Sequence, residues 1–135
     1  MEDFTVTASI EHLQAVTDHV NEKLEKAECP PKALAQIDIA IDEIFSNICR
    51  YAYVSTEGTA VIRTEIDPET DTVSLTFSDQ GIPWNPLEAE EPDIAASAED
   101  RPIGGLGLFL VKNLMDEVNY EYKDGCNRLT IRKKL

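Results

Sequence analysis

Three short motifs hold the residues of this chain whose types and spacing could do chemistry. Glu43 and Asn47 lie four residues apart in DEIFSNICRYAY, and two glycine-bearing stretches follow, DQGIP at 79–83 and GGLGLF at 104–109. Each motif alone is common. In this order and at these distances, the three are typical of a nucleotide pocket that needs no lysine-bearing phosphate loop.

The Glu-x-x-x-Asn motif lies in an amphipathic helical pattern. A stripe at 3-4-3-4 spacing predicts the buried face of the helix, made of Leu34, Ile37, Ile41, Ile44 and Ile48. A second stripe borders the first and comprises Gln36, Ala40, Glu43, Asn47 and Arg50. Glu43 and Asn47 are therefore predicted at the edge of the core, where a ligand could fit between helix and sheet. A solvated polar face is the alternative interpretation.

Asp79 is the candidate contact for the amino group of a ligand. It continues the alternation of a predicted strand, so its carboxylate is expected on the core side with Val73, Leu75 and Phe77. An unpaired charge there is costly, and a bound ligand could supply the hydrogen-bond donor that the carboxylate needs. Gly81 allows a ligand to approach the backbone closely. The alternative is an Asp-x-Gly turn that only ends the strand.

The Gly104-Gly105-Leu106-Gly107 run opens a predicted helix. Glycines at this position expose backbone N–H groups, and the helix dipole adds positive potential, so phosphate can be held without a basic side chain. This arrangement suits a chain whose net charge is −14. A flexible hinge with close packing is the alternative interpretation.

The first part of the chain must position Glu43 and Asn47. Residues 4–8 are predicted to form a strand, and Ser9 is predicted to cap a helix with a stripe of Ile10, Leu13, Thr17, Val20, Leu24 and Ala27. Pro31 suits the first turn of a second helix, which is predicted from about Lys32 to Val54.

The second part of the chain must position the two glycine motifs. Strands are predicted at 59–66 and 72–79, an irregular surface loop at 80–103 and a helix from near Gly105. VNYEYK and CNRLTIR flank Asp124-Gly125, which is a strong hairpin signal. The order of elements predicts a two-layer α/β sandwich, with a mostly antiparallel five-stranded sheet and three helices on one face.

Composition limits the class of protein. The chain has 135 residues, 42% of them hydrophobic, which suits a single globular domain over 1–135. Its acidity disfavours nucleic-acid binding, and neither a membrane span nor a signal peptide is apparent. The chain is expected to be a reduced cytoplasmic protein, because it has only three cysteines and they lack metal-like spacing. We expect His12 and His19 to be surface or capping residues.

Together the motifs resemble those of the GHKL (Bergerat-fold) ATPases, and within them the RsbW-type anti-sigma factors with serine kinase activity. The resemblance covers the chain from about Phe4 to its end. EIFSNICRYAY resembles the N box of that family, SDQGIPWNP its first glycine box and RPIGGLGLFLVKNL its second. The second glycine box is the most specific match, because both the Gly-Leu-Gly-Leu-Phe run and the following helix agree with the pattern.

The resemblance implies a role for each site residue. Asn47 would coordinate Mg²⁺ through its side-chain oxygen, and Glu43 would act as general base. Asp79 would accept a hydrogen bond from the adenine amino group of ATP, with Gly81 against the base. Residues 84–103 would form a lid over ATP. The triphosphate would lie against Gly105, Gly107 and Leu108, with Gly104 as a hinge. Arg101 would reach the γ-phosphate or remain a surface charge of the lid.

The resemblance also implies partners. An anti-anti-sigma protein with a STAS domain would be the phosphorylation substrate, a sigma factor would be sequestered, and the protein would form a homodimer. Two departures leave phosphotransfer open, since Tyr51 stands where the family often has His and Pro83 where many members have glycine. The alternatives are a nucleotide-dependent binding module without catalysis and a fragment of a sensor histidine kinase.

Overall fold

The computed structural model describes residues 3–53, 58–83, 85 and 105–135. These residues form the strands β1 (Asp3–Thr7), β2 (Thr59–Asp67), β3 (Thr72–Asp79), β4 (Glu117–Lys123) and β5 (Cys126–Lys134). They also form the α-helices α1 (Leu13–Lys26), α2 (Pro31–Asn47) and α3 (Gly105–Leu114). A short 3₁₀ helix, η1 (Ile10–His12), precedes α1, and a π-helical turn, η2 (Ile48–Ala52), continues α2.

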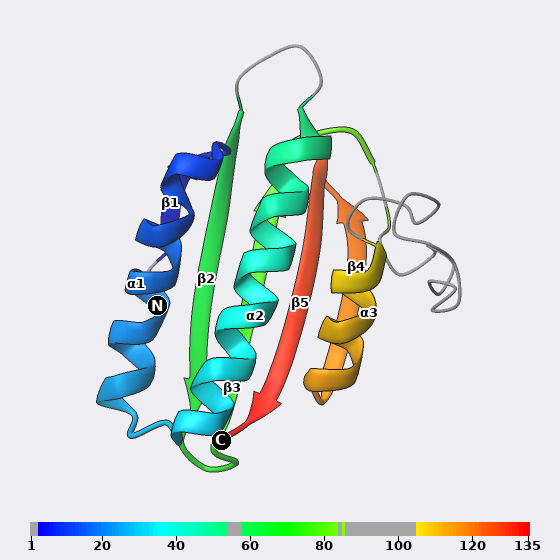
Figure 1. Ribbon diagram of the computed structural model, residues 1–135. Helices are drawn as coiled ribbons and strands as arrows, with labels where there is room; N and C mark the ends of the chain where they lie inside the picture. The colour runs from blue at the N-terminus through cyan, green and yellow to red at the C-terminus, as the bar shows by residue number, and fades with distance from the viewer. Residues whose placement is uncertain (1–2, 54–57, 84, 86–104) are drawn as a thin grey trace.

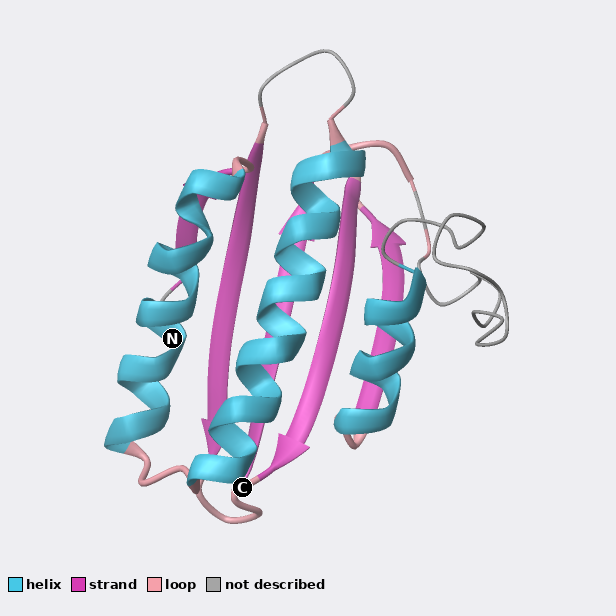
Figure 2. Ribbon diagram, viewed as in Figure 1, coloured by secondary structure: helices cyan, strands magenta, loops and turns pink. Residues whose placement is uncertain are grey.

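The strands form one antiparallel sheet in the order β1-β2-β3-β5-β4. The three α-helices lie side by side on one face of this sheet, with α2 between α1 and α3 (Figures 1 and 2). The predicted two-layer α/β sandwich with a mostly antiparallel five-stranded sheet is confirmed. The central strand β3 lies between β2 and β5, so its carboxyl-terminal residue, Asp79, has a neighbouring strand on each side.

The core fills the space between the helices and the sheet. Along β3 the inward-facing residues Val73, Leu75 and Phe77 are each 1% exposed, whereas the residues between them are half-buried. The predicted isoleucine stripe of α2 faces these side chains, and Ile37 and Ile41 are fully buried. Burial of apolar surface stabilises the folded state by about 25 cal/mol per Å². Because the isoleucine stripe must face the sheet, this burial also fixes the rotation of α2 about its axis. Glu43 and Asn47 are thereby held beside the core.

The β4–β5 hairpin turns at Asp124-Gly125, as predicted. Both residues have positive φ, 55° and 77°, as a two-residue turn of type I′ requires and as Asp and Gly tolerate. The turn sets the register between β4 and β5. On its other side β5 pairs with β3, and there Asn127 lies opposite Asp79.

Three predictions about the helices are wrong in detail. The second helix does not continue regularly to Val54, because its α-helical part ends at Asn47 and the π-helical turn follows; Val54 itself lies outside the described residues. Ser9 precedes η1 in extended conformation, but its side chain makes no capping hydrogen bond. Ile10 and Ala27 are exposed and do not belong to the buried stripe of α1, which consists of Val16, Val20 and Leu24.

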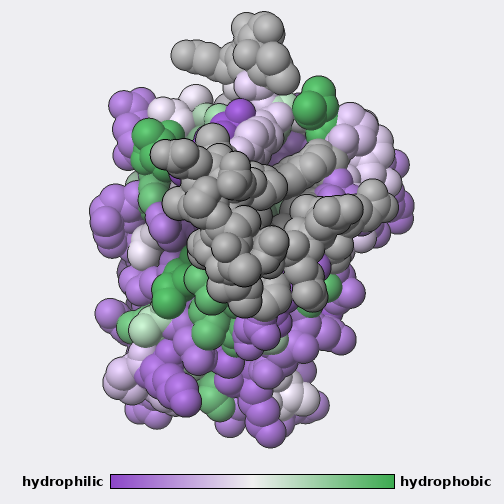
Figure 3. Space-filling model, turned by 45° about the vertical axis from the view of Figure 1, so that its right-hand side comes forward, coloured by the Kyte–Doolittle hydropathy of each residue, from purple (hydrophilic) through white to green (hydrophobic). Residues whose placement is uncertain are grey.

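The surface is dominated by polar side chains. Figure 3 shows one face on which hydrophilic residues prevail among the described residues and apolar side chains occur in small separate groups, in keeping with the net charge of −14. Among the described helices, none combines the length and apolar character that crossing a membrane requires.

Candidate functional site

Asp79 ends β3 with its carboxylate on the core side, as its position in the strand predicts. The residue is 7% exposed. Its Oδ1 accepts two hydrogen bonds, from the backbone N–H of Gly81 at 2.9 Å and from Nδ2 of Asn127 at 2.9 Å. Oδ2 accepts no hydrogen bond from the described residues. Hydrogen bonds to Oδ1 therefore stabilise the carboxylate, and Oδ2 can accept a hydrogen bond from a ligand.

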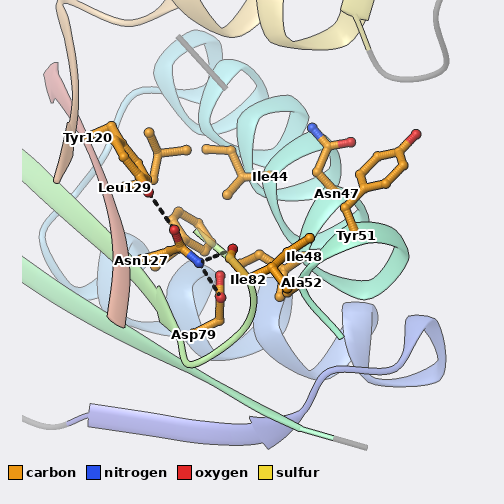
Figure 4. A pocket seen from close by; sticks show the side chains of 11 residues that line it. Ile44, Asn47, Ile48, Tyr51, Ala52, Asp79, Ile82, Tyr120, Asn127 and Leu129 are labelled. Carbon is orange, nitrogen blue, oxygen red and sulfur yellow. Dashed lines mark hydrogen bonds between the residues drawn. The ribbon is translucent and has the colours of Figure 1, made fainter. Parts of the chain in front are cut away.

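Asn127 is a site residue that the sequence reasoning missed. It is 7% exposed, and besides Asp79 it donates a hydrogen bond from Nδ2 to the carbonyl oxygen of Ile82 at 2.8 Å (Figure 4). Its Oδ1 accepts a short hydrogen bond from the hydroxyl of Tyr120. The signal was present in the sequence: Asn127 alternates in phase with Leu129 and Ile131, so a polar residue occupies an inward-facing strand position.

The loop after β3 is fixed by its own main chain. The N–H of Gln80 donates to the hydroxyl of Tyr53 at 2.8 Å, and the N–H of Ile82 donates to the carbonyl of Ala52 at 3.0 Å. The N–H of Gly81 is bound by Asp79, so all three successive N–H groups have partners. This loop is therefore attached to both β3 and the turn η2.

Gly81 has a packing reason to lack a side chain. A Cβ atom at this position would lie 2.1 Å from the carbonyl oxygen of Ala52, far inside van der Waals contact. The close approach is between two segments of the chain itself, η2 and the loop after β3. Contact of Gly81 with a nucleotide base stays a prediction.

A cavity of about 480 Å³, its open mouth included, lies between the α2–η2 segment and the sheet. Its walls are mostly apolar, with Asp79 and Asn127 as polar groups on the sheet side and Asn47 with Tyr51 on the helix side (Figure 4). The remaining lining residues are Ile44, Ile48, Ala52, Phe77, Ile82, Tyr120 and Leu129. An apolar cleft with few oriented polar groups is the usual form of a small-molecule site.

Glu43 and Asn47 contact each other on successive turns of α2. Nδ2 of Asn47 donates a hydrogen bond to Oε1 of Glu43 at 3.2 Å. Partial burial raises the pKa of Glu43 above its ordinary value of 4.5, and the hydrogen bond from Asn47 opposes this shift. A carboxylate with a raised pKa is better suited to accept a proton near neutral pH than an ordinary glutamate is.

The side-chain oxygen of Asn47 fits a cation ligand. Asn47 is 6% exposed, and its Oδ1 is buried without a hydrogen-bond partner among the described residues. Leaving such an oxygen unsatisfied is costly, so the site is suited to a group that binds oxygen. Mg²⁺ prefers oxygen ligands and commonly takes only one or two from the protein, with phosphates and water completing its shell.

The second glycine motif lies only partly within the described residues. Gly105 begins α3, and Gly107 and Leu108 belong to its first turn. α3 packs beside α2, and in Figure 1 its N-terminal end points toward the end of the molecule where α2 finishes. Gly104, Arg101 and the predicted lid, apart from Asn85, lie outside the described residues, so their roles stay predictions.

Comparison with known proteins identifies the family of the chain. The model of the family described as "Histidine kinase-like ATPase domain" matches residues 6–133. Serine/threonine-protein kinase BtrW of Bordetella bronchiseptica is 32% identical over 95 residues, which is 70% of this chain and 66% of that protein. Serine-protein kinase RsbW of Listeria monocytogenes is 32% identical over 101 residues, covering 71% and 63%. These matches thus span just under two thirds of either relative.

A third relative matches at greater length, and solved structures share the fold. Serine-protein kinase RsbW of Staphylococcus aureus is 27% identical over 98% of this chain and 87% of that protein. The structure of the RsbU and RsbW domains of Rv1364c from Mycobacterium tuberculosis aligns with a TM-score of 0.67 at 16% identity, covering 100% of this chain and 33% of that one. A histidine kinase domain from Erythrobacter litoralis aligns with a TM-score of 0.58 at 16% identity, covering 91% and 61%.

The predicted resemblance to RsbW-type proteins is thereby confirmed, and the likeness in fold extends to both solved structures. The matched segment, residues 6–133, includes the helix with Glu43 and Asn47, the strand that ends at Asp79 and the helix that begins at Gly105. This chain belongs to the histidine kinase-like ATPase domain family.

Proposed function

We propose that the protein is an ATP-dependent protein serine kinase of the RsbW type, in which Glu43 is the general base. The observation that carries the proposal is the pair on α2: a glutamate with a raised pKa next to an asparagine whose buried Oδ1 lacks a partner among the described residues. The names of the relatives from Bordetella, Listeria and Staphylococcus support the same activity.

The adenine end of ATP would lie in the apolar part of the cavity. There Asp79 would accept a hydrogen bond from the 6-amino group. The accepting atom would be Oδ2, because Oδ1 is already engaged by Gly81 and Asn127. The apolar walls, among them Ile44 and Leu129, would exclude water from the faces of the base. The energy of burying the base would then favour binding, and the single carboxylate would set its orientation.

The catalytic end would lie at α2. Asn47 would hold Mg²⁺ through Oδ1, and the bound ion would neutralise phosphate charge. Glu43 accepts the Asn47 hydrogen bond on Oε1, so Oε2 is the atom that would take the proton of an incoming serine hydroxyl. Backbone N–H groups at the start of α3, at Gly105 and Gly107, would hold phosphate oxygens with help from the helix dipole.

The partners follow from the family resemblance. The substrate would be an anti-anti-sigma protein with a STAS domain, and a sigma factor would be held by the same protein, which would act as a homodimer in the cytoplasm. The acidity of the chain supports protein partners over nucleic acid, because phosphate backbones require a basic face. Arg101, Gly104 and the lid at 84–103 would complete the phosphate end.

One experiment tests the activity and separates it from its alternative. Purified protein is incubated with γ-labelled ATP, Mg²⁺ and STAS proteins encoded beside its gene. The proposal expects label on a serine of one STAS protein, and expects Glu43→Gln to lose labelling while ATP binding measured by calorimetry persists. ATP binding without transfer to any candidate would indicate a nucleotide-dependent binding module, and the absence of ATP binding would overturn both.

A further inference from the structure

The buried polar group Asn127 has no role in the proposed chemistry, yet it contacts the residue on which base recognition depends. It lies directly opposite Asp79 in the β3–β5 pairing. Its Nδ2 makes two hydrogen bonds, to Oδ1 of Asp79 at 2.9 Å and to the carbonyl of Ile82 at 2.8 Å. Both protons of the amide are therefore used to hold Asp79 and the loop that follows it.

The orientation of the Asn127 amide is determined by its neighbours. Asp79 and the Ile82 carbonyl are both acceptors, so the NH₂ group must face them, because the amide oxygen would be repelled there. The amide oxygen then faces Tyr120, whose hydroxyl donates the short hydrogen bond to it. Figure 4 shows the resulting chain of contacts from Tyr120 through Asn127 to Asp79.

The chain of contacts restricts the Asp79 carboxylate. Rotation of a carboxylate about its last torsion is soft, so a single partner would leave the plane of the group poorly defined. Here one oxygen is held from two directions, by the N–H of Gly81 and by Nδ2 of Asn127. The second oxygen, Oδ2, is then held in one position at the cavity that Asp79 lines.

We propose that Tyr120 and Asn127 are positioning residues for base selection: they hold Asp79 so that Oδ2 accepts from a 6-amino purine and rejects a 6-oxo purine. This inference rests on the proposed function, since it concerns the nucleotide of the same site. Adenine carries an amino donor at position 6, whereas a 6-oxo purine carries an acceptor that would face the carboxylate. A site built to pair a particular polar group discriminates strongly only while its own group stays in place.

The experiment compares the affinities for ATP and inosine triphosphate, which carries a 6-oxo group. Calorimetry with Mg²⁺ gives both dissociation constants for the wild-type protein, Asn127→Leu and Tyr120→Phe. Tyr122→Phe is the matched control for Tyr120→Phe. Tyr122 is on the same strand as Tyr120, is 48% exposed and does not line the cavity. Thermal melts of each variant record any loss of stability separately from selectivity.

The inference expects the preference for ATP over inosine triphosphate to fall by about tenfold in Asn127→Leu and by less in Tyr120→Phe, which removes the more distant contact. Tyr122→Phe should keep the wild-type preference. A purely structural role would weaken both nucleotides equally and leave the ratio unchanged, and that result would overturn the inference while leaving the kinase proposal standing.

Three further cases are also covered by this design. Should Asn127→Leu fail to fold, Tyr120→Phe carries the test, because it keeps the ring and removes only the hydroxyl. A wild-type protein that binds ATP and inosine triphosphate equally would overturn the inference alone. A wild-type protein that binds neither would overturn the proposed function, and the inference with it.

Discussion

The amide of Asn47 donates its hydrogen bond to Oε1 of Glu43, at 3.2 Å and one helical turn away. This contact orients both members of the pair: it directs Oδ1 of Asn47 away from Glu43, and it leaves Oε2 of Glu43 to meet a substrate. One i,i+4 contact on α2 therefore couples the proposed metal ligand to the proposed base.

Replacing Glu43 by Gln should abolish transfer without abolishing binding. Glutamine keeps the shape and can still accept from Asn47, but it cannot take a proton, so the phosphotransfer rate should fall by about 10²–10⁴. The measurement pairs a labelled-ATP transfer assay with calorimetry. Asp42→Asn, the same change at the exposed neighbouring position, is the control and should keep full activity. Equal loss in both variants would contradict the assignment.

The stability of the protein should depend on pH through Glu43. Partial burial raises the pKa of Glu43 in the folded protein above its ordinary value of 4.5, so between these two pKa values the folded state binds more protons than the unfolded state. Its contribution to stability is therefore present below pH 4.5 and is lost as the pH rises through the folded pKa.

Glu43→Gln removes this dependence. The variant should have a larger free energy of unfolding than the wild type at pH 7, and the difference should shrink toward pH 4, as measured by urea denaturation. A difference that stays constant between the two pH values would show that the pKa of Glu43 is not raised in the folded protein.

Replacing Asn47 by Ala should remove the Mg²⁺-dependent part of ATP affinity. In the wild type, chelation of Mg²⁺ should weaken ATP binding by at least about tenfold, the effect expected for a lost interaction with a charged group. In Asn47→Ala, calorimetry with and without a chelator should give similar affinities. Asn119→Ala, at an exposed position of β4, should behave as the wild type. A variant that retains the full Mg²⁺ effect would exclude Asn47 as the ligand.

Replacing Asp79 by Asn should weaken ATP binding while keeping the local fold. The new Oδ1 can still accept from Gly81 and Asn127, but the new NH₂ group would face the amino group of adenine, and two donors cannot pair. We expect a loss of about 10- to 100-fold in ATP affinity. Asp124→Asn, in the exposed hairpin turn, is the control that should change nothing. Unchanged ATP affinity in Asp79→Asn would refute the contact.

Replacing Gly81 by Ala should distort the edge of the cavity and destabilise the fold. The added Cβ would lie 2.1 Å from the Ala52 carbonyl oxygen, so η2 and the loop after β3 must separate, at a cost of about 1–3 kcal/mol. Gly125→Ala is the informative comparison: its φ of 77° makes alanine strained by about 1–2 kcal/mol, but the space around it is open. Both variants should melt at lower temperature, and only Gly81→Ala should lose ATP affinity.

Strand alternation explains why much of the fold and part of the site could be predicted. The positions of Val73, Leu75 and Phe77 place Asp79 inward, and the structure confirms its burial. The 3-4 spacing of the isoleucines likewise places Glu43 and Asn47 beside the core. Such inferences succeed because they require only the periodicity of a helix or strand and the distinction between apolar and polar side chains.

Other features depend on contacts that sequence periodicity does not contain. The pairing of Asn127 with Asp79 joins residues 48 positions apart on two strands that no turn connects, so their register depends on packing between distant parts of the chain. The π-helical turn at Ile48–Ala52 was missed because its apolar residues also fit a regular helix. Ser9 has a typical capping side chain, but the 3₁₀ turn that follows does not use it.

The anchoring of residues 80–82 through their main chain has an evolutionary consequence. The shape of this edge is specified by backbone N–H groups and by their partners, whereas the side chain of Gln80 is exposed among the described residues. Among homologous proteins, we therefore expect the residue at position 80 to vary and glycine to be retained at position 81, where a Cβ would meet the Ala52 carbonyl.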